Sequence, residues 1–550
     1  MSDRRSFALV GLAVFLVAVA MRTIPLYWSY LPFNLDGFQF AAPARYALQH
    51  GHLPSFASYF QPDKYSFSVL LTIVSQLTGV SPLRIAQPLI AVIGAVPCLV
   101  AVSLVRRIGT QRGWHVSQAR LAAAVAGLVL AVEGIYLGRS AAVTSEGAGI
   151  VFVALLAVVF YRALRTGRSS WMLLSFVFVF LLPLTHVLAT IEGALVVTAL
   201  LALSMRRFQT RALRFGVLLV AVFWVYLGGY YSILEMGEMG RVTSAPGLFV
   251  AWLLVLVMLS VWVPTASPRL QRGLPFGLLF VGCTIFAANF FVPVFPGTAA
   301  TPSLVLLLTA PVTVIGIFAS WGTPFITNLD TDGEVVVALL FGPLVLIGFA
   351  LTGGLTFEYQ GIVVRGQIFV HLAAVVLAAL AAVSLGYRSV SGIRFSGNFQ
   401  SVLVPLLVLS AIVSTPLAFL GLHATPAQPL TTPDEFEATT FATTHASERW
   451  ISDGHISRLA SYYYPTRTNV TYRPVYQWLY GNERPPQCLT LSQESWTTTG
   501  AQLFPAAPAQ IDNERYNGWI ASHHVIYTTG GADPIVISRP EAPVSGLCQE

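Results

Sequence analysis

The sequence predicts an all-α polytopic membrane bundle of about 13 transmembrane helices, followed by a small α/β extracytoplasmic C-terminal domain. Three observations lead to this fold class. Only 10% of the 550 residues are charged and 55% are hydrophobic, whereas a soluble domain carries roughly a quarter charged residues to hydrate its surface. Apolar runs long enough to cross a bilayer recur along most of the chain. Beyond about His423 these runs stop, and Thr, Tyr, Pro, Asn and charged residues take their place.

Each apolar run of roughly 17–25 residues is interpreted as a spanning helix. The first run is too long for the apolar core of a signal peptide, so we expect it to remain as a mature helix. The run from Ser66 to Val80 is short for a crossing and predicts a re-entrant or interfacial helix. The predicted spans are 7–26, 84–105, 120–138, 144–161, 170–184, 187–204, 215–232, 247–264, 274–296, 302–321, 335–353, 366–386 and 400–421.

The basic residues indicate the orientation, because short cytoplasmic loops retain Lys and Arg. With the N-terminus inside, the N-terminal segment and five inner loops hold 17 of the 31 basic residues. A further inner loop, near 322–334, breaks the pattern with Asp330, Asp332 and Glu334. We therefore expect a multi-pass protein of the cell (plasma) membrane, with a cytoplasmic N-terminus and an extracellular C-terminal domain.

The chain divides into a transmembrane domain, residues 1–422, and an extracytoplasmic domain, residues 423–550. A stretch of about 125 residues is the right size for one small domain. In it, Asp434–Ile451 is predicted to be helical, and His523–Thr529 and Pro534–Ser538 are predicted to be strands. Cys488 and Cys548 would form a disulfide in an oxidising exterior, and two free thiols are the alternative.

Most of the acidic residues outside the C-terminal domain gather on one side of the predicted membrane. Ionisable groups at membrane depth are costly and usually line a polar cavity, so we expect such a cavity to open outward between the helices. The basic residues are dispersed among short loops, which argues against a nucleic-acid partner despite the net charge of +7. Eight of the 24 acidic residues fall in outer loops or outer span ends: Asp36, Asp63, Glu133, Glu146, Glu192, Glu235, Glu238 and Glu358.

The first outer loop, residues 27–65, is the longest of the predicted outer loops. It carries Asn34-Leu35-Asp36-Gly37-Phe38 just after a membrane exit and Asp63-Lys64-Tyr65 at its end. Asp36 could accept a proton from a sugar hydroxyl, or it could cap the helix that follows. Lys64 could neutralise a phosphate, or it could lie at the interface beside Tyr65.

Other charged residues flank the predicted outer turns. Arg139 and Glu146 could bind a phosphate and a sugar hydroxyl, or they could pair and tie two helices together. His186 could contact a phosphate, or it could form an interhelical hydrogen bond. Glu358 and Arg365 flank the entry to the twelfth span, where an arginine suits a lipid phosphate or an interfacial anchor.

These residues together resemble the C superfamily of membrane glycosyltransferases (GT-C). Asp36 in a long first outer loop, the many spans and the outer C-terminal domain carry the resemblance. More narrowly, the chain is similar to archaeal dolichyl-phosphate-mannose-dependent mannosyltransferases. The stretches that support this likeness are Asn34–Pro54, Asp63-Lys64-Tyr65, Leu77–Leu83, Leu184-Thr185-His186 and Val364–Gln367.

The resemblance implies transfer of a single sugar, mannose, from a dolichyl- or polyprenyl-phosphate donor to a glycolipid or glycoprotein acceptor. It implies inversion at the anomeric carbon, with Asp36 as general base and the lipid tail between the spans. The implied phosphate-binding residues are Lys64, Arg139, Arg365 and His186. The implied sugar- and acceptor-binding residues are Glu146, Arg45, His52, Glu358 and Tyr65.

Two features of the superfamily are missing from the sequence. Oligosaccharyltransferases carry a WWDYG motif in the outer domain, whereas this chain has only Arg449–Gly454 and Tyr462–Pro465 in its place, which favours transfer of one sugar. Asp36 is followed by Gly37 rather than by a second acid. Since no HExxH or CxxC cluster is present either, we expect no metal or other cofactor, although a divalent cation remains compatible with the sequence.

Two other classes of protein would share these features. A transporter or flippase of lipid-linked sugars needs the same outward cavity, but it usually shows paired broken helices in two repeats, and the sequence has no such repeat. A non-catalytic assembly protein would tolerate the loss of Asp36, whereas an enzyme would lose turnover and keep its fold.

Overall fold

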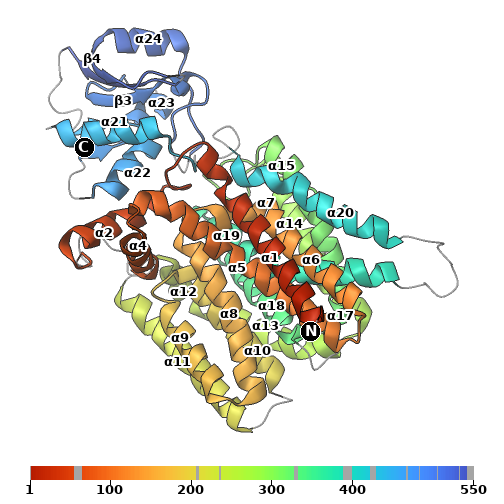
Figure 1. Cartoon of the computed structure of the whole chain (residues 1–550). Helices are drawn as coiled ribbons and strands as arrows, with labels where there is room; N and C mark the ends of the chain where they lie inside the picture. The colour runs from red at the N-terminus through yellow and green to blue at the C-terminus, as the bar shows by residue number, and fades with distance from the viewer. Residues whose placement is uncertain are drawn as a thin grey trace.

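The chain forms a helical bundle with a small α/β domain at one end, which we call the domain end (Figure 1). The N-terminus lies at the opposite end, where α1 (Ser2–Thr23) begins. This computed structural model describes residues 2–54, 65–205, 210–234, 237–327, 332–387, 399–420, 429–446, 448–465, 469–481, 484–503, 506–531 and 533–541.

The bundle is entirely helical in its described residues. After α1 come η1 (Ile24–Tyr27), α2 (Asp36–His50), α4 (Tyr65–Thr78), α5 (Pro82–Gln111), α6 (Val116–Val132), α7 (Gly134–Ala141), α8 (Ser145–Thr166), α9 (Ser169–Leu181), α10 (Val187–Ser204) and α11 (Thr210–Ile233). The second half comprises α12 (Gly237–Ser244), α13 (Pro246–Trp262), η3 (Val263–Thr265), α14 (Pro268–Phe291), α15 (Ser303–Thr309), α16 (Val312–Gly322), α17 (Pro324–Thr327), α18 (Gly333–Gly353), α19 (Phe357–Tyr387), α20 (Phe399–Ser414) and η4 (Thr415–Phe419).

Eleven helices of the described chain are long and apolar enough to cross a membrane, or up to twelve if one bent pair counts as a single span. The prediction of about thirteen spans differs from this at two places. The predicted span 120–138 is α6 and α7, which meet at an angle of 63°. The predicted span 170–184 contains α9, a helix of 13 residues. The predicted short helix from Ser66 to Val80 is present as α4, with 14 residues. The chain is a multi-pass membrane bundle, as predicted.

Glu133 and Gly134 account for the bend between α6 and α7. The Glu133 carboxylate accepts two backbone N–H groups from the first turn of α7, at 2.9 and 3.0 Å. It therefore caps a new helix at the point where α6 stops. The same carboxylate lies 2.8 Å from Nδ1 of His371 on α19. A Cβ atom on Gly134 would meet the carbonyl oxygen of Ser414, so only glycine allows this close approach.

The interior of the bundle consists of α5, α8, α10, α18 and α19, whereas α1, α13 and α14 expose most of their apolar side chains. In lipid no hydrophobic effect drives helices together, so association depends on close packing, which small residues permit. Helix α19 follows this rule with fully buried alanines at positions 373, 378, 379, 381 and 382. The exposed leucine and phenylalanine side chains of the outer helices suit contact with lipid.

The acidic loop that broke the charge pattern is neutralised by arginines at the end opposite the domain. Asp332 is buried, and its carboxylate lies 3.3 Å from Arg162, 3.6 Å from Arg107 and 3.8 Å from Arg165. These arginines come from the ends of α5 and α8. The structure therefore brings together three loops that the sequence assigned to one side of the membrane.

The C-terminal domain contains one mixed sheet and four α-helices among its described residues. Its elements are α21 (Pro433–His445), β1 (Trp450–Ile451), α22 (Gly454–Tyr463), β2 (Val470–Thr471), α23 (Arg473–Tyr480), β3 (Leu489–Gln493), η6 (Glu494–Thr497), α24 (Asn513–Ala521), β4 (His523–Thr528) and β5 (Ile535–Pro540). The strand order is β2-β1-β3-β5-β4. Strands β2, β1 and β3 run parallel, and β5 pairs antiparallel with β3 and β4.

Sequence patterns predicted several of these elements. The two predicted strands are β4 and β5. The predicted helix Asp434–Ile451 is α21, but it ends at His445, and Trp450 and Ile451 instead form β1, where they pair with β2 and β3. Cys488 is disulfide-bonded, as predicted for it, whereas its predicted partner Cys548 lies outside the described residues.

The domain rests on α2, which lies between it and the bundle. The Nη2 atom of Arg45 donates to the carbonyl oxygen of Tyr463 at 3.0 Å, and the guanidinium lies 4.0 Å from the centre of the Tyr463 ring. The Phe38 and Phe436 rings stack with centroids 5.8 Å apart. These cation–π and aromatic contacts join α2 to α21 and α22, so α2 and the domain pack directly against each other.

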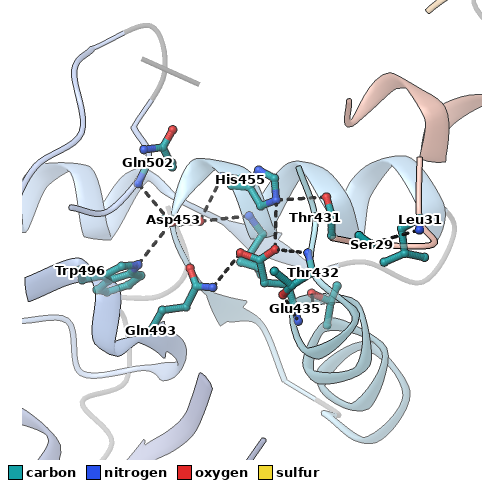
Figure 2. A network of polar contacts seen from close by, with 12 residues as sticks. Ser29, Leu31, Thr431, Thr432, Glu435, Asp453, His455, Gln493, Trp496 and Gln502 are labelled. Atoms are coloured by element: carbon teal, nitrogen blue, oxygen red, sulfur yellow. Dashed lines mark hydrogen bonds and ion pairs between the residues drawn. The ribbon is translucent and has the colours of Figure 1, made fainter. Parts of the chain in front are cut away.

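A buried polar network joins α21, α22 and the sheet (Figure 2). Asp453 accepts the backbone N–H groups of His455 and Gln502 and the indole N–H of Trp496, at 3.1, 3.1 and 3.3 Å. Glu435 accepts Nε2 of Gln493 at 2.8 Å and lies 3.7 Å from the His455 ring. Buried polar groups need such partners, and here they fix α21 and α22 against β3.

We expect the C-terminal domain to lose stability as the pH rises from about 4.5 to 7. Burial raises the pKa of Glu435 to about 7, against the lowering effect of its hydrogen bonds, and burial also raises the pKa of Asp453. In this window the folded chain holds a proton that the unfolded chain releases. The loss attributable to Glu435 is about 3 kcal/mol, and it is complete above pH 7.

Hydrogen exchange of the β3 and β5 amides at several pH values, corrected for intrinsic rates, measures this loss. Glu435→Gln should flatten the dependence, because an amide cannot ionise. Glu437→Gln, an exposed neighbour on α21, is the matched control and should leave the dependence intact. A dependence that persists unchanged in Glu435→Gln would contradict the prediction.

Candidate functional site

The loop that precedes α2 is held by a buried glutamine of α5. Gln87 accepts the backbone N–H of Phe33 at 3.0 Å and donates to the carbonyl oxygens of Arg22 and Ala141 at 2.8 and 2.9 Å. The carbonyl oxygen of Phe33 in turn accepts the N–H of Val143 at 2.8 Å. The loop is therefore fixed against α1, α5 and the turn between α7 and α8.

Asp36 is the first residue of α2 and is half-buried. Its carboxylate is in electrostatic range of Tyr462 on α22. The pKa of the Tyr462 hydroxyl is raised, first by burial and then by Asp36, against the effect of Arg458. The predicted base thus lies at the domain end of the bundle and faces the C-terminal domain, with a protonated phenol beside it.

Gly37 explains why Asp36 has no acidic neighbour. A Cβ atom at this position would meet Cβ of Pro32 and would lie 3.1 Å from Cβ of Val143. Real Cβ atoms do not approach other atoms so closely. A second acid therefore cannot follow Asp36 unless Pro32 and Val143 move.

Gly37→Ala should destabilise the loop, because the added methyl group overlaps Pro32. Overpacking of this kind costs about 1–3 kcal/mol, measurable as a lower melting temperature in detergent. Gly361→Ala is the matched control, because a Cβ atom there meets nothing within 4 Å and alanine favours the helix. Equal melting temperatures for both variants would contradict the steric argument.

Glu146, His186 and Arg365 form a polar cluster between α8, α10 and α19. Nε of Arg365 donates to Oε2 of Glu146 at 3.0 Å, and Nη2 of Arg365 lies 2.5 Å from Nε2 of His186. Glu146 and His186 are buried, whereas the Arg365 side chain is 28% exposed. Arg139, on the last turn of α7, is half-buried and acts electrostatically on Glu146. The structure thus brings these four predicted residues together.

The two ring nitrogens of His186 both face hydrogen-bond donors. Nδ1 accepts the backbone N–H of Ala189 at 3.3 Å, and His186 thereby caps α10. A neutral imidazole has only one acceptor nitrogen, and a guanidinium can only donate, so the tautomer of His186 decides which of these two contacts is a hydrogen bond. The Arg365 guanidinium carries five N–H donors and is partly exposed, so an anionic oxygen can accept from it.

Both ends of the first loop reach this cluster. At one end, the chain before Asp36 is bonded to Val143, three residues before Glu146. At the other end, Ser66 donates its backbone N–H to Leu184 at 2.9 Å, and its hydroxyl lies 2.7 Å from that of Thr185, the residue before His186. Tyr65 begins α4 at this point. Lys64, the residue before it, lies outside the described residues.

Three predicted binding residues lie apart from the cluster. Arg45 holds the C-terminal domain on α2, as described above. Glu358 pairs with Arg241 at 3.1 Å, and both side chains are exposed. His52 is exposed beyond the C-terminal end of α2, with its ring 5.7 Å from that of Tyr46. Among the described contacts, none connects these three side chains to Glu146, His186 or Arg365.

Gln87 and His371, the partner of Glu133, were not among the predicted site residues. Gln87 is fully buried on an otherwise apolar span, and an isolated amide in such a run signals a structural or functional role. His371 on α19 has the same signature. Among the described residues of the outer ends, Glu146 pairs with Arg365 and Glu358 pairs with Arg241, and the outward polar cavity stays a prediction. A cavity of about 60 Å³ lies elsewhere, lined by Ser260, Thr327 and Glu334 among others.

Among the described residues, no three His, Cys, Asp or Glu side chains gather as metal ligands would. Asp36 also has no acidic neighbour in sequence, because the next residue is Gly37. What this part of the chain does offer is a half-buried carboxylate, Asp36, and a separate cluster that holds the cations Arg139 and Arg365. Such a set suits proton abstraction and the binding of a phosphate.

No protein family and no curated protein matches this chain by sequence. Solved structures do resemble it. The archaeal oligosaccharyltransferase AglB from Archaeoglobus fulgidus, in complex with an inhibitory peptide and a dolichol-phosphate, is 11% identical, with a TM-score of 0.47 over 97% of this chain and 75% of its own. ArnT from Cupriavidus metallidurans, bound to undecaprenyl phosphate, is 10% identical, with a TM-score of 0.37 over 99% and 98%.

The arabinofuranosyltransferase AftD from Mycobacteria is 13% identical, with a TM-score of 0.49 over 98% of this chain and 40% of its own. All three are membrane glycosyltransferases of the GT-C superfamily, the superfamily that the first loop resembles. With TM-scores below 0.5, the likeness concerns the general arrangement of the chain. The roles of individual residues depend on the contacts described above.

Proposed function

We propose that this chain is a glycosyltransferase that moves one sugar, mannose, from a dolichyl- or polyprenyl-phosphate donor to a glycolipid or glycoprotein acceptor. The reaction would take place at the domain end, on the extracellular face of the cell membrane, with the N-terminus in the cytoplasm. One observation carries the proposal. The chain just before Asp36 is bonded to Val143, three residues before Glu146, and Ser66, just past the first loop, is bonded to Leu184 and Thr185 beside His186.

Asp36 is suited to act as general base. It is half-buried at the start of α2, beside the C-terminal domain. Its carboxylate would take the proton of an acceptor hydroxyl while the oxygen attacks the anomeric carbon. The bond between that carbon and the phosphate oxygen breaks on the opposite side, which inverts the configuration. Positioned bases of this kind contribute about 10²- to 10⁴-fold to rate.

The cluster is suited to bind the phosphate that leaves with the lipid. The departing oxygen becomes more negative as its bond to carbon breaks, and donors aimed at that charge lower the barrier. Arg365 supplies such donors, with His186 and Arg139 in the same cluster. Lys64, on the first outer loop, is a further candidate. Glu146 is buried in its pair with Arg365. It would therefore orient the guanidinium rather than bind a sugar hydroxyl directly.

The remaining predicted residues have supporting roles in this proposal. Tyr65 lies at the loop end next to the cluster, and Arg45 would keep the C-terminal domain over Asp36. His52 and Glu358 are exposed at the same end and would meet only a large acceptor. The apolar surface of the outer helices would hold the polyprenyl tail. No step requires a metal or another cofactor.

The test is a transfer assay with the full chain in detergent micelles. Dolichyl-phosphate-linked mannose is supplied with a glycolipid extract, and labelled product is measured. Micelles have no second compartment, so product can form only by chemistry and not by transport. Transfer supports the proposal. Tight donor binding without product would instead indicate a transporter, and neither binding nor product would indicate an assembly protein.

A further inference from the structure

Asn34, two residues before Asp36, has an unusual backbone conformation. Its φ is 106°, and among the described residues it is the only non-glycine residue with a positive φ. In this region the Cβ atom of an L-residue is crowded, and asparagine tolerates it best because its amide can bond locally. Strain of this kind persists only where the surroundings impose it, and such residues concentrate at functional sites.

Three hydrogen bonds hold Asn34 in this conformation. Its side-chain oxygen accepts the backbone N–H of Asp36 at 2.9 Å. Its carbonyl oxygen accepts the N–H of Gly37 at 3.1 Å, and its own N–H donates to the carbonyl oxygen of Pro429 at 2.7 Å. The first two bonds form the turn that starts α2, so they set the direction in which the Asp36 side chain leaves the helix.

The bond to Pro429 connects this turn to the C-terminal domain. Pro429 belongs to the segment that leads into α21, and Thr431 and Thr432 follow it in the network of His455 and Glu435. The bundle holds Phe33 through Gln87, and this segment holds the next residue. Asn34 is therefore the point where the bundle, the domain and the start of α2 meet.

We propose that Asn34 is a positioning residue for Asp36, and that the segment at Pro429 acts on the reaction through it. This inference rests on the proposed function, because it requires Asp36 to be the base. The amide of Asn34 holds the first turn of α2 in the orientation that the base needs. The C-terminal domain then contributes to turnover even though it supplies no reacting group.

Asn34→Gly separates positioning from folding. Glycine adopts a φ of 106° without strain and keeps the N–H that bonds to Pro429, but it loses the amide oxygen that holds Asp36. We expect kcat to fall by about 10- to 100-fold, as for other small displacements of a catalytic group. The melting temperature and the KM for the donor should stay at their wild-type values. Asn34→Asp keeps the side-chain oxygen and should restore most of kcat.

Asn289→Gly is the matched control. Asn289 also bonds to backbone and side chain, at 2.9 Å to Val294 and 2.9 Å to Thr301, and both partners belong to the segment between α14 and α15. This variant should leave kcat unchanged. Wild-type kcat in Asn34→Gly, or equal loss in Asn34→Gly and Asn34→Asp, would overturn the inference.

Pro429→Gly tests the part played by the domain. It keeps the acceptor carbonyl but frees the backbone around it, so kcat should fall in the same way, without adding to the effect of Asn34→Gly. Full additivity would show that the two residues act separately and would overturn this part.

A wild-type chain without any transfer would overturn the proposed function, and the positioning role with it. With an active wild type, an unchanged kcat in the variants would overturn the positioning role alone.

Discussion

Asp36→Asn should lower kcat for sugar transfer by about 10²- to 10⁴-fold, the usual contribution of a general base. The amide has the same shape as the carboxylate, but it cannot take the proton of the acceptor hydroxyl. The hydrogen bond from the Asp36 backbone to Asn34 does not involve the Asp36 side chain, so the start of α2 should be unaffected. We therefore expect little change in the KM for the donor or in the melting temperature.

A matched aspartate distinguishes loss of the base from loss of a helix cap. Asp512 is the N-cap of α24, and its side chain accepts the N–H groups of Glu514 and Arg515 at 2.9 and 3.3 Å. Asp512→Asn alters a cap in the C-terminal domain and should leave transfer unchanged. If Asp36→Asn kept the wild-type kcat, the base would be another group, and Asp36 would serve only as the first residue of α2.

Arg365→Ala should abolish transfer and also destabilise the bundle, by about 3–5 kcal/mol. The Glu146 side chain is 3% exposed and has its ion partner in Arg365 at 3.0 Å. Removal of the guanidinium leaves a buried carboxylate without that partner, and in a low-dielectric interior this is costly. The melting temperature in detergent measures the loss of stability, and donor binding measures the loss of the phosphate site.

The double variant Glu146→Gln/Arg365→Gln separates these two effects. It removes both charges, so most of the stability should return, while transfer should remain lost because the cation is gone. Arg241→Ala is the control for a paired arginine at the same end. Its partner Glu358 is 48% exposed, and exposed pairs contribute only about 0–1 kcal/mol. A single Arg365→Ala variant with the wild-type melting temperature would show that the pair does not stabilise the fold.

The helical bundle was largely predictable, because the bilayer imposes the same requirement on every long apolar run. A run of about 20 apolar residues must cross the membrane as a helix wherever it occurs. The described helices depart from the predicted spans at two places, where local features interrupt an apolar run. Glu133 caps a new helix in the middle of one apolar run, and the other run contains Pro183, after α9 has ended. Neither effect is visible in hydropathy.

The pairing of charges was only partly predictable. Arginines of two loops and the aspartate of a third were assigned to one side from charge counts, and they do meet at Asp332. At the other end, Glu146 and Arg139 were considered as a pair, but the partner with the direct contact is Arg365, 219 residues along the chain. Arg45 was predicted from the sequence to bind the sugar or the acceptor. In the structure its guanidinium donates to Tyr463 of the C-terminal domain.

The sequence by itself determined the membrane bundle, the separate C-terminal domain and the first loop with Asp36. Length, hydropathy and composition suffice for this, because they are properties of each local stretch of sequence. The tertiary structure alone decided which polar groups meet. It placed His186 beside Arg365, closed the space after Asp36 to any residue but glycine, and joined Asn34 to Pro429. These outcomes depend on which helices approach one another and how closely, and no local property of the chain specifies that distance.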